Sequence, residues 1–416
     1  MAEEFKFIHA SDFHLDQPIS GLVELPNHIK STIANAPYQA AERVFDLAIT
    51  EKVDFVLLSG DLFDLDQGGC RPSAFLLSQF ERLNEKGIEI YWCGGETDHP
   101  DRWPTAVDLP ENVTTFTTPV VEEAFHQRRG TTLATIVASG VDIQRRNNAD
   151  FLVESSATFP IGLSYGRFEI NAMSAKPIRY WALGGQHRHQ ILDNTTHLIV
   201  SAGSPQGRSP AESGPHGCYL IRVDNKGAMH PHFVETDRVR WLPQKIAIAE
   251  STDLEQLKNI VGERALKLAN DHSEMMLLVD WQFIASGVFN PQLRRPEQTE
   301  NLREWIRKEF GMGQTGIWTN TVSFDSPANL PDGWYEEDTI LGDYLRAVGR
   351  YEGDESMNLA LHEYLPKHVD ADEAGTFVRV SEQHRKMILE AAKLCGINYL
   401  AANRDWEDAE ASSSTS

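Results

Sequence analysis

The chain has little cysteine, no long apolar run and a shortage of positive charge. Its cysteines are far apart and form no CxxC pair: Cys70, Cys93, Cys218 and Cys395. This spacing argues against disulfides and a structural zinc, and it favours a reduced, cytoplasmic protein. No apolar run approaches the roughly 20 residues of a membrane-spanning helix. The acidic N-terminus leads directly into a predicted strand, so we expect neither a membrane anchor nor a signal peptide.

Charge bears on which ligands the surface can attract. The chain has 38 Lys and Arg against 61 Asp and Glu, a formal net charge of −23. Because Lys and Arg drive binding to phosphate backbones, a uniformly acidic surface would repel DNA. Short basic pairs such as Arg128–Arg129 and Arg145–Arg146 fit scattered surface charge better than a binding footprint, which needs clustering in space. Charge alone therefore counts against DNA, unless a partner supplies a basic surface.

The length of 416 residues predicts two or three domains. We expect the main domain at residues 1–240. Alternating strand and helix patterns predict a smaller α+β domain at 241–330, and amphipathic stripes predict a helical region at 331–404. The acidic, Ser-rich tail at 405–416 should be disordered.

One stretch organises the first domain, the apolar run from Phe55 that ends at Gly60–Asp61. A run that is apolar at every position suits a strand covered on both faces, as in a parallel sheet between helices. Ligands bind beyond the carboxyl ends of such strands, which places Asp61 at the mouth of a crevice. Taken alone, Gly–Asp fits an ordinary turn equally well.

An upstream strand decides between these readings. Residues 5–11 read as a strand that runs into Asp12 and His14, and a helical pattern separates it from the Asp61 strand. Neighbouring parallel strands would bring Asp12, His14 and Asp61 to one edge of the sheet. Two carboxylates and an imidazole suit Mn, Fe or Zn with positions left open for water. Further polar loops follow later strands, at 94–99, 184–189 and 203–208.

The order of these motifs resembles the calcineurin-like metallophosphoesterases, and more closely their SbcD-type and YhaO-like DNA repair exonuclease family. Residues 12–18 are similar to that family's DLHLDSP, and residues 53–64 to its VDFVLxxGDLFD. Residues 180–184 read YWALG as in the family, and residues 206–219 are similar to its QGR…GPKGCY. The likeness covers about residues 5–240.

The resemblance implies an α/β fold, a four-layer α/β-β/α metallophosphoesterase sandwich with a smaller α+β capping domain and C-terminal helices. It also implies phosphodiester hydrolysis by water activated on divalent metal, with Mn as the expected ion. The partners it implies are DNA and an SbcC-like SMC ATPase, and the family is often homodimeric.

This sequence has side chains that can bind a metal at every position implied for the first metal, but not at every position implied for the second. The first metal would be held by Asp12, His14, His187 and the bridging Asp61. The three other positions of the second metal fall, without gaps, on Glu96, Tyr165 and Gly185, and the assisting His falls on Thr97. Glu96 can bind a hard cation, whereas a neutral Tyr is a poor ligand and Gly offers no side chain.

A shifted register would instead use Asp98 and His99, which makes His99 the candidate catalytic residue. Arg208, in the QGR motif, is the candidate nucleic-acid contact. Because removal of a general acid or base costs about 10² to 10⁴ in rate, we expect a one-metal centre with slow hydrolysis or none. Three functions stay open: a DNA exonuclease or endonuclease, a catalytically impaired scaffold subunit of an SMC-like ATPase complex, and a small-molecule phosphatase or phosphodiesterase.

Overall fold

The computed structural model describes residues 3–400 with gaps. The gaps are 104–106, 119, 140–150, 152–156, 167–168, 250, 286–292, 294–295, 313–315, 326–331, 355–356, 358 and 360–381. The expected disordered tail and the Arg145–Arg146 pair lie outside the described residues. Among the described residues, no helix has the length and apolar character needed to cross a membrane.

The contacts divide the chain into two compact units. The first comprises Met1–Pro243, Leu268–Val279 and Phe310–Asn320, and the second comprises Gln244–Lys267, Asp280–Glu309 and Thr321–Ser416. Every candidate site residue named above belongs to the first unit.

The first unit contains two six-stranded sheets. One sheet has the order β12-β11-β1-β2-β3-β4, with bounds β1 (Phe5–Ala10), β2 (Phe55–Ser59), β3 (Glu89–Cys93), β4 (Val113–Phe116), β11 (Gly217–Val223) and β12 (Met229–Glu235). β1 to β4 are parallel, β11 pairs antiparallel with β1, and β12 pairs antiparallel with β11. Ala10 is in register with Leu58, which confirms that the strands before Asp12 and Asp61 are parallel neighbours.

The other sheet has the order β5-β6-β7-β8-β10-β9. Its strands are β5 (Glu122–Arg128), β6 (Thr131–Ala138), β7 (Pro160–Tyr165), β8 (Tyr180–Gly184), β9 (Gln190–Asn194) and β10 (Leu198–Ser201). The four central strands are parallel, and the two edge strands are antiparallel. Tyr165 is in register with Gly184, so β7 and β8 end together.

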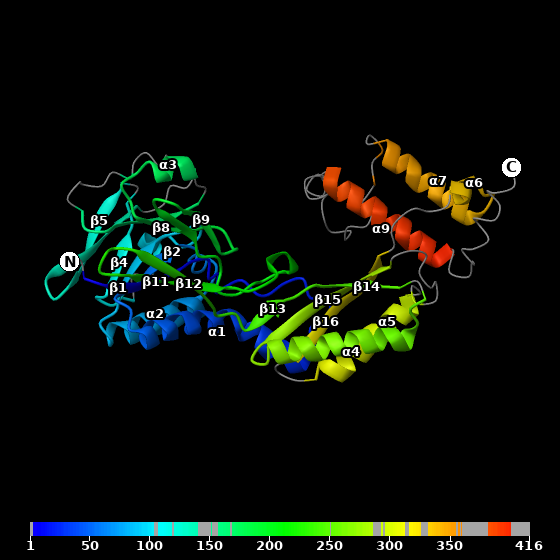
Figure 1. The fold of residues 1–416 in the computed structure, drawn as a ribbon, viewed down its shortest axis with the longest axis horizontal. Coiled ribbons are helices and arrows are strands. Elements are labelled where there is room, and N and C mark those ends of the chain that lie inside the picture. Colours follow the sequence, from blue (N-terminus) through cyan, green and yellow to red (C-terminus); the bar gives the residue numbers. More distant parts are fainter. Residues whose placement is uncertain are drawn as a thin grey trace. The chain divides into compact units, whose positions relative to one another are not determined.

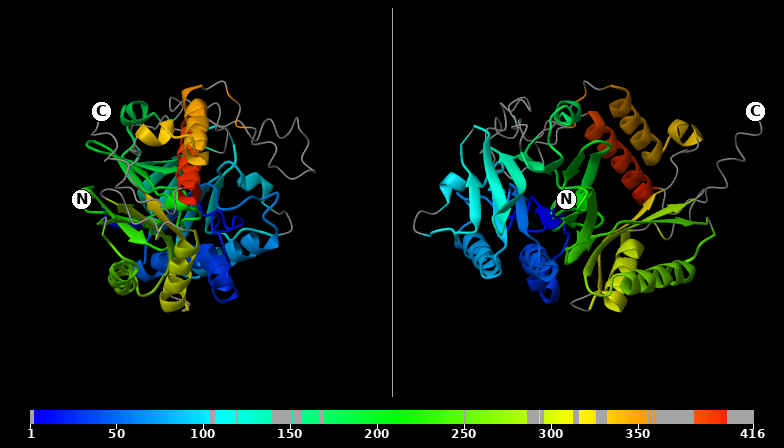
Figure 2. Two further views of the ribbon diagram at one scale, coloured as in Figure 1. Left: turned by 90° about the vertical axis from the view of Figure 1, so that its right-hand side faces the viewer. Right: turned by 60° about the vertical axis from the view of Figure 1, so that its left-hand side comes forward.

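The two sheets face each other and are covered by helices on their outer faces (Figures 1 and 2). Alternate residues of β1 and β2, such as Phe7 and Leu57, pack with Leu163 and Tyr180 of the second sheet. The opposite faces of β1 and β2 pack against α1 (Asn27–Glu51) and α2 (Cys70–Asn84). The second sheet packs on its other face with residues around α3 (Ile170–Ser174). This arrangement confirms the predicted four-layer sandwich, because strands that are apolar at every position are buried on both faces.

The second unit has the α+β and helical character that the sequence indicates. β14 (Gln244–Ile248) pairs in parallel with the later part of β15 (Met276–Ala285). The unit further contains β16 (Gly316–Asp325) in its later part, α4 (Leu254–Asp271) in its earlier part, α5 (Pro296–Phe310), α6 (Asp332–Glu336), α7 (Ile340–Gly353) and α9 (Glu382–Leu400).

Helices α7 and α9 lie side by side and antiparallel in this unit (Figure 2). The hydroxyl of Tyr344 donates to the carbonyl of Ala392 at 2.6 Å, while Arg385 donates to the carbonyl of Tyr351 near the other end of the pair.

A buried histidine ties the two sheets of the first unit together. The His9 ring lies between the hydroxyls of Tyr180 and Ser59, each 2.9 Å from one of its nitrogens. Burial lowers the pKa of His9 to about 3. The unfolded chain therefore takes up a proton first, and the stability that neutral His9 provides above its ordinary pKa of 6.5 is lost as pH falls towards 3.

We expect the H9Q variant to be less stable than the wild type at pH 7 but to lose stability more slowly on acidification. Below pH 6.5 the wild-type free energy of unfolding should fall faster than that of H9Q by about 1.4 kcal/mol per pH unit. Urea unfolding at several pH values measures this difference. The exposed His232, changed to Gln, is the control and should keep the wild-type slope. Equal slopes for H9Q and the wild type would contradict the assignment.

Candidate metal centre

Two loops at the carboxyl ends of β1 and β2 run side by side and are joined through their backbones. The N–H of Asp12 donates to the carbonyl of Gly60 (2.9 Å), and the N–H of His14 donates to that of Asp61 (3.0 Å). The side chains of these loops therefore meet at one edge of the sheet, as the sequence predicted. Asp12, His14 and Asp61 are all buried.

The backbone at these three residues is in the left-handed region. The φ angles are 54° at Asp12, 42° at His14 and 53° at Asp61. Such conformations cost residues other than Gly about 1 to 3 kcal/mol each, and they persist where the surroundings impose them, often at functional sites. Gly60 has a φ of 86°, and a Cβ there would lie 2.7 Å from the backbone of Gly95. The turn before Asp61 therefore requires glycine.

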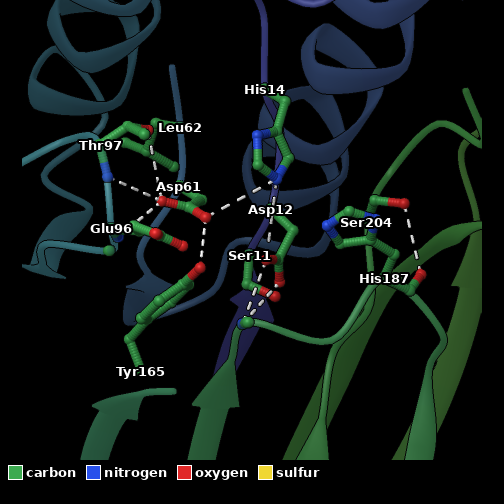
Figure 3. A network of polar contacts seen from close by, with 12 residues as sticks. Ser11, Asp12, His14, Asp61, Leu62, Glu96, Thr97, Tyr165, His187 and Ser204 are labelled. Atoms are coloured by element: carbon green, nitrogen blue, oxygen red, sulfur yellow. Dashed lines mark hydrogen bonds and ion pairs between the residues drawn. The ribbon is translucent and has the colours of Figure 1, made fainter. Parts of the chain in front are cut away.

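Three side chains bring potential ligand atoms together. Asp12, His14 and His187 each contribute one potential ligand atom, and these three atoms lie within 4.8 Å of one another. Among the described residues, this is the group that could hold a metal ion. Asp61 borders the group, since its Oδ2 is 3.8 Å from Nε2 of His14. Figure 3 shows Asp12 and His14 between Asp61 on one side and His187 on the other. The His187 side chain is 38 % exposed, so solvent reaches the group from this side.

The state of His14 and Asp12 fits a cation at this position. Both ring nitrogens of His14 are buried without a hydrogen-bond partner. Burial, and next the positive charge of Arg208, lowers the pKa of His14 to about 3, so the ring is a neutral ligand near pH 7. Burial raises the pKa of Asp12 to about 6, and the Asp61 carboxylate adds to the increase. A bound cation would satisfy one of these two nitrogens and stabilise the buried carboxylates.

Gly184 and Gly185 bring the second sheet close to Asp12. A Cβ on Gly184 would lie 1.8 Å from the carbonyl oxygen of Ser59, so only glycine permits this approach. The N–H of Gly185 then donates to both oxygens of Asp12, each at 3.1 Å.

Both oxygens of Asp61 accept hydrogen bonds (Figure 3). Its Oδ1 accepts from the backbone N–H groups of Glu96 (2.8 Å) and Thr97 (3.2 Å). Its Oδ2 accepts from the hydroxyl of Tyr165. Burial and the charge of Asp61 raise the pKa of Tyr165, which keeps this hydroxyl protonated and donating.

The side chains expected at a second metal do not form a ligand group. The Glu96 side chain is exposed and lies outside the group of Asp12, His14 and His187. Gly185 contributes only its backbone N–H. The sequence reasoning recognised Tyr165 as a poor ligand but missed its hydrogen bond to Asp61, because nothing in the spacing shows which strand end faces which.

In the loop at 94–99, the Asp98 side chain is buried, whereas His99 is half-buried. The Asp98 carboxylate is buried and accepts from the N–H groups of Asp61, Leu62 and Gly95 and from the Trp92 indole. It supports the loops instead of pointing a free oxygen at a metal. His99 is half-buried just before the short helix η1 (Pro100–Arg102), and within the described chain no hydrogen bond or ion pair joins its ring to the cluster.

Arg208 and Glu212 surround His187. Arg208 is buried, and its guanidinium donates to Gln17 (3.1 Å) and lies 3.1 Å from Nδ1 of His187. It therefore faces the ligand group instead of an open surface. Glu212, which the sequence analysis missed, has its Oε1 2.6 Å from the same Nδ1.

The Glu212 carboxylate is ionised. Its burial favours a higher pKa, but the hydrogen bonds from His187 and from the Arg208 N–H outweigh this effect and hold the pKa of Glu212 at about 2. His189, by contrast, does not join the site, because its ring stacks on Phe233 with centroids 3.6 Å apart.

We expect D98N to destabilise the first unit. An amide in place of the carboxylate would set an NH₂ group against two N–H donors, and each buried donor left unsatisfied costs about 1 to 3 kcal/mol. The free energy of unfolding should therefore fall by about 2 to 6 kcal/mol, measured by urea denaturation. D101N, at an exposed neighbouring residue, should change little. A D98N protein as stable as D101N would show that the Asp98 hydrogen bonds do not hold the loops.

Comparisons with known proteins identify relatives of this chain. A family model described as calcineurin-like phosphoesterase matches residues 5–144. The chain is 27% identical to the Bacillus subtilis protein named uncharacterized metallophosphoesterase YhaO, over 95% of this chain and 97% of that protein. It is 22% identical to the DNA double-strand break repair protein Mre11 of Saccharolobus solfataricus, over 88% of this chain and 96% of that protein. A solved dimetal phosphatase from Danio rerio aligns with 56% of this chain and 97% of its own, at 9% identity and a TM-score of 0.35, too low to carry an argument.

Proposed function

The chain belongs to the calcineurin-like metallophosphoesterases, and we propose that it binds a single divalent cation and hydrolyses phosphodiesters slowly. The proposed ligands are Asp12, His14 and His187, with Asp61 beside them. The observation that carries this proposal is the contrast between the His14 ring, which has no hydrogen-bond partner, and the Asp61 carboxylate, whose two oxygens already accept from the Glu96 N–H and the Tyr165 hydroxyl. The proposed metal is Mn, which accepts mixed carboxylate and imidazole ligands.

When bound, the cation supplies positive charge that polarises a phosphoryl oxygen and activates water. The protein contributes the positions of its ligands, fixed by the paired loops, and the charge of Arg208 beside His187. Tyr165 cannot act as a base near pH 7, because its hydroxyl remains protonated and donates to Asp61. Thr97 likewise offers only a hydroxyl, which points to Asp61 at 3.4 Å. We therefore expect proton transfer to limit the rate of hydrolysis.

The proposed substrate is DNA, with a partner of the SMC ATPase class. The support is the 22% identity to the archaeal Mre11, a DNA double-strand break repair protein. The net charge of −23 requires that a partner supply much of the basic surface. Arg208 would contact only a phosphate that reaches the cation, since its side chain is buried.

The domain limits at residues 240, 330 and 404 stay predictions. The homodimer also stays a prediction.

A second candidate function is a binding or scaffold subunit without catalysis. The hydrogen bond from Tyr165 to Asp61 favours it, because this bond replaces a second cation with a neutral donor. Both candidates predict one cation per chain, so turnover separates them.

We expect about one Mn²⁺ per chain. Metal-free protein would be loaded with Mn²⁺, desalted and measured by inductively coupled plasma mass spectrometry. D12A should bind none, since it removes a central buried ligand. A count of two Mn²⁺ per wild-type chain would contradict the single-cation proposal, and no retained metal in the wild type would refute the site altogether.

Activity should be weak and should depend on His99 if that imidazole assists the reaction. Linear duplex DNA and nitrophenyl phosphate esters would be assayed with Mn²⁺, with D61N as the inactive reference. Loss of an assisting acid or base lowers the rate by about 10² to 10⁴, so H99A should fall towards D61N. An unchanged H99A rate removes His99 from the mechanism. Ester turnover without DNA cleavage would indicate a small-molecule phosphatase, and no turnover would favour the scaffold.

A further inference from the structure

Glu212 stands directly behind His187 and is held at both carboxylate oxygens. Oε1 is 2.6 Å from Nδ1 of His187, and Oε2 accepts the backbone N–H of Arg208 at 2.7 Å. The Glu212 side chain is only 14 % exposed. A carboxylate shielded from water in this way forms a stronger hydrogen bond than one on the surface.

The short contact decides which nitrogen of His187 carries hydrogen. An ionised carboxylate only accepts, so Nδ1 must donate to Glu212, and the lone pair of the neutral ring is then on Nε2, which lies 3.4 Å from the Arg208 guanidinium. The guanidinium of Arg208 lies 3.1 Å from Nδ1, but it has no lone pair there to accept. Were Nδ1 to accept from Arg208 instead, its lone pair would face the Glu212 oxygen at 2.6 Å, which is repulsive.

The loop that carries Glu212 is itself fixed. Glu212 ends the short helix η3 (Pro210–Glu212), and its carbonyl accepts from Nε2 of His216 at 2.9 Å. His216 is buried, and its other nitrogen is 2.9 Å from the hydroxyl of Ser204. The carbonyl of His187 in turn accepts from the N–H of Ser204 at 3.0 Å. Glu212 and His187 are therefore linked through their loops as well as through their side chains. Figure 3 shows the hydroxyl of Ser204, which also donates to the His187 carbonyl at 3.3 Å.

We infer that Glu212 is a positioning residue for His187: it holds the ring with hydrogen on Nδ1 and turns Nε2 towards the cation. The inference rests on the proposed cation site. Glu212 Oε1 also lies 3.7 Å from the Arg208 guanidinium, so it offsets a positive charge beside a site that must accept another. Carboxylates that orient ligating histidines in this way typically contribute about 10- to 100-fold to metal affinity.

The test compares full-length wild type with E212A, E212Q and the exposed control E111A. Mn²⁺ affinity is measured by isothermal titration calorimetry. We expect E212A to bind about 10- to 100-fold more weakly, and E111A to match the wild type. E212Q should fall between them, because its amide oxygen can still accept the Nδ1 hydrogen but carries no charge.

The second readout is the tautomer of His187 in metal-free protein, observed by long-range ¹H–¹⁵N NMR. The wild type and E212Q should show hydrogen on Nδ1, and E212A should lose this preference. Should E212A fail to fold, E212Q still tests the charge contribution through its affinity. Wild-type affinity in both Glu212 variants, or an unchanged tautomer in E212A, would overturn the inference. A wild type that binds no Mn²⁺ would refute the proposed cation site, while the tautomer would still report on Glu212.

Discussion

The backbone hydrogen bonds between the loops after β1 and β2 are the interaction on which the rest of the site depends. They run from Asp12 to Gly60 and from His14 to Asp61, and they hold three ligand-bearing residues in left-handed conformations that isolated residues avoid. Asp98 stabilises the second of these loops by accepting from the N–H groups of Asp61 and Leu62. The fold thus stabilises an unfavourable backbone so that buried carboxylates and an imidazole converge.

The resulting centre is asymmetric. On one side, His14 is buried with both ring nitrogens unpaired, and His187 is partly open to solvent. On the other, both oxygens of Asp61 accept hydrogen bonds, from Tyr165 and from the backbone of the 94–99 loop. A buried polar group without a partner is costly, whereas a satisfied one is stable. The first side therefore gains from a cation, and the second has no such need.

Much of this arrangement could be predicted from the sequence, and the reasons for the remainder are physical. Apolar runs that end in Asp12, His14 and Asp61 predicted parallel neighbours, because strand period and burial are local properties. The motifs also predicted that His187 joins these residues. The Tyr165 hydrogen bond and the support from Glu212 depend on how two sheets and a Pro-containing turn meet across long sequence separations. Asp98 and His99 are adjacent in sequence, but the backbone turn that directs the Asp98 carboxylate inward to four donors cannot be read from their order in the chain.

We propose that one cation binds beside Asp61, and that the hydrogen bond from Tyr165 to Asp61 takes the place of a second cation. Anomalous diffraction from a Mn²⁺-soaked crystal, recorded near the manganese absorption edge, tests it most directly. We expect a single anomalous peak in contact with Asp12, His14 and His187. A second peak of comparable height between Asp61 and the 94–99 loop, with the Tyr165 hydroxyl displaced from Asp61, would contradict it.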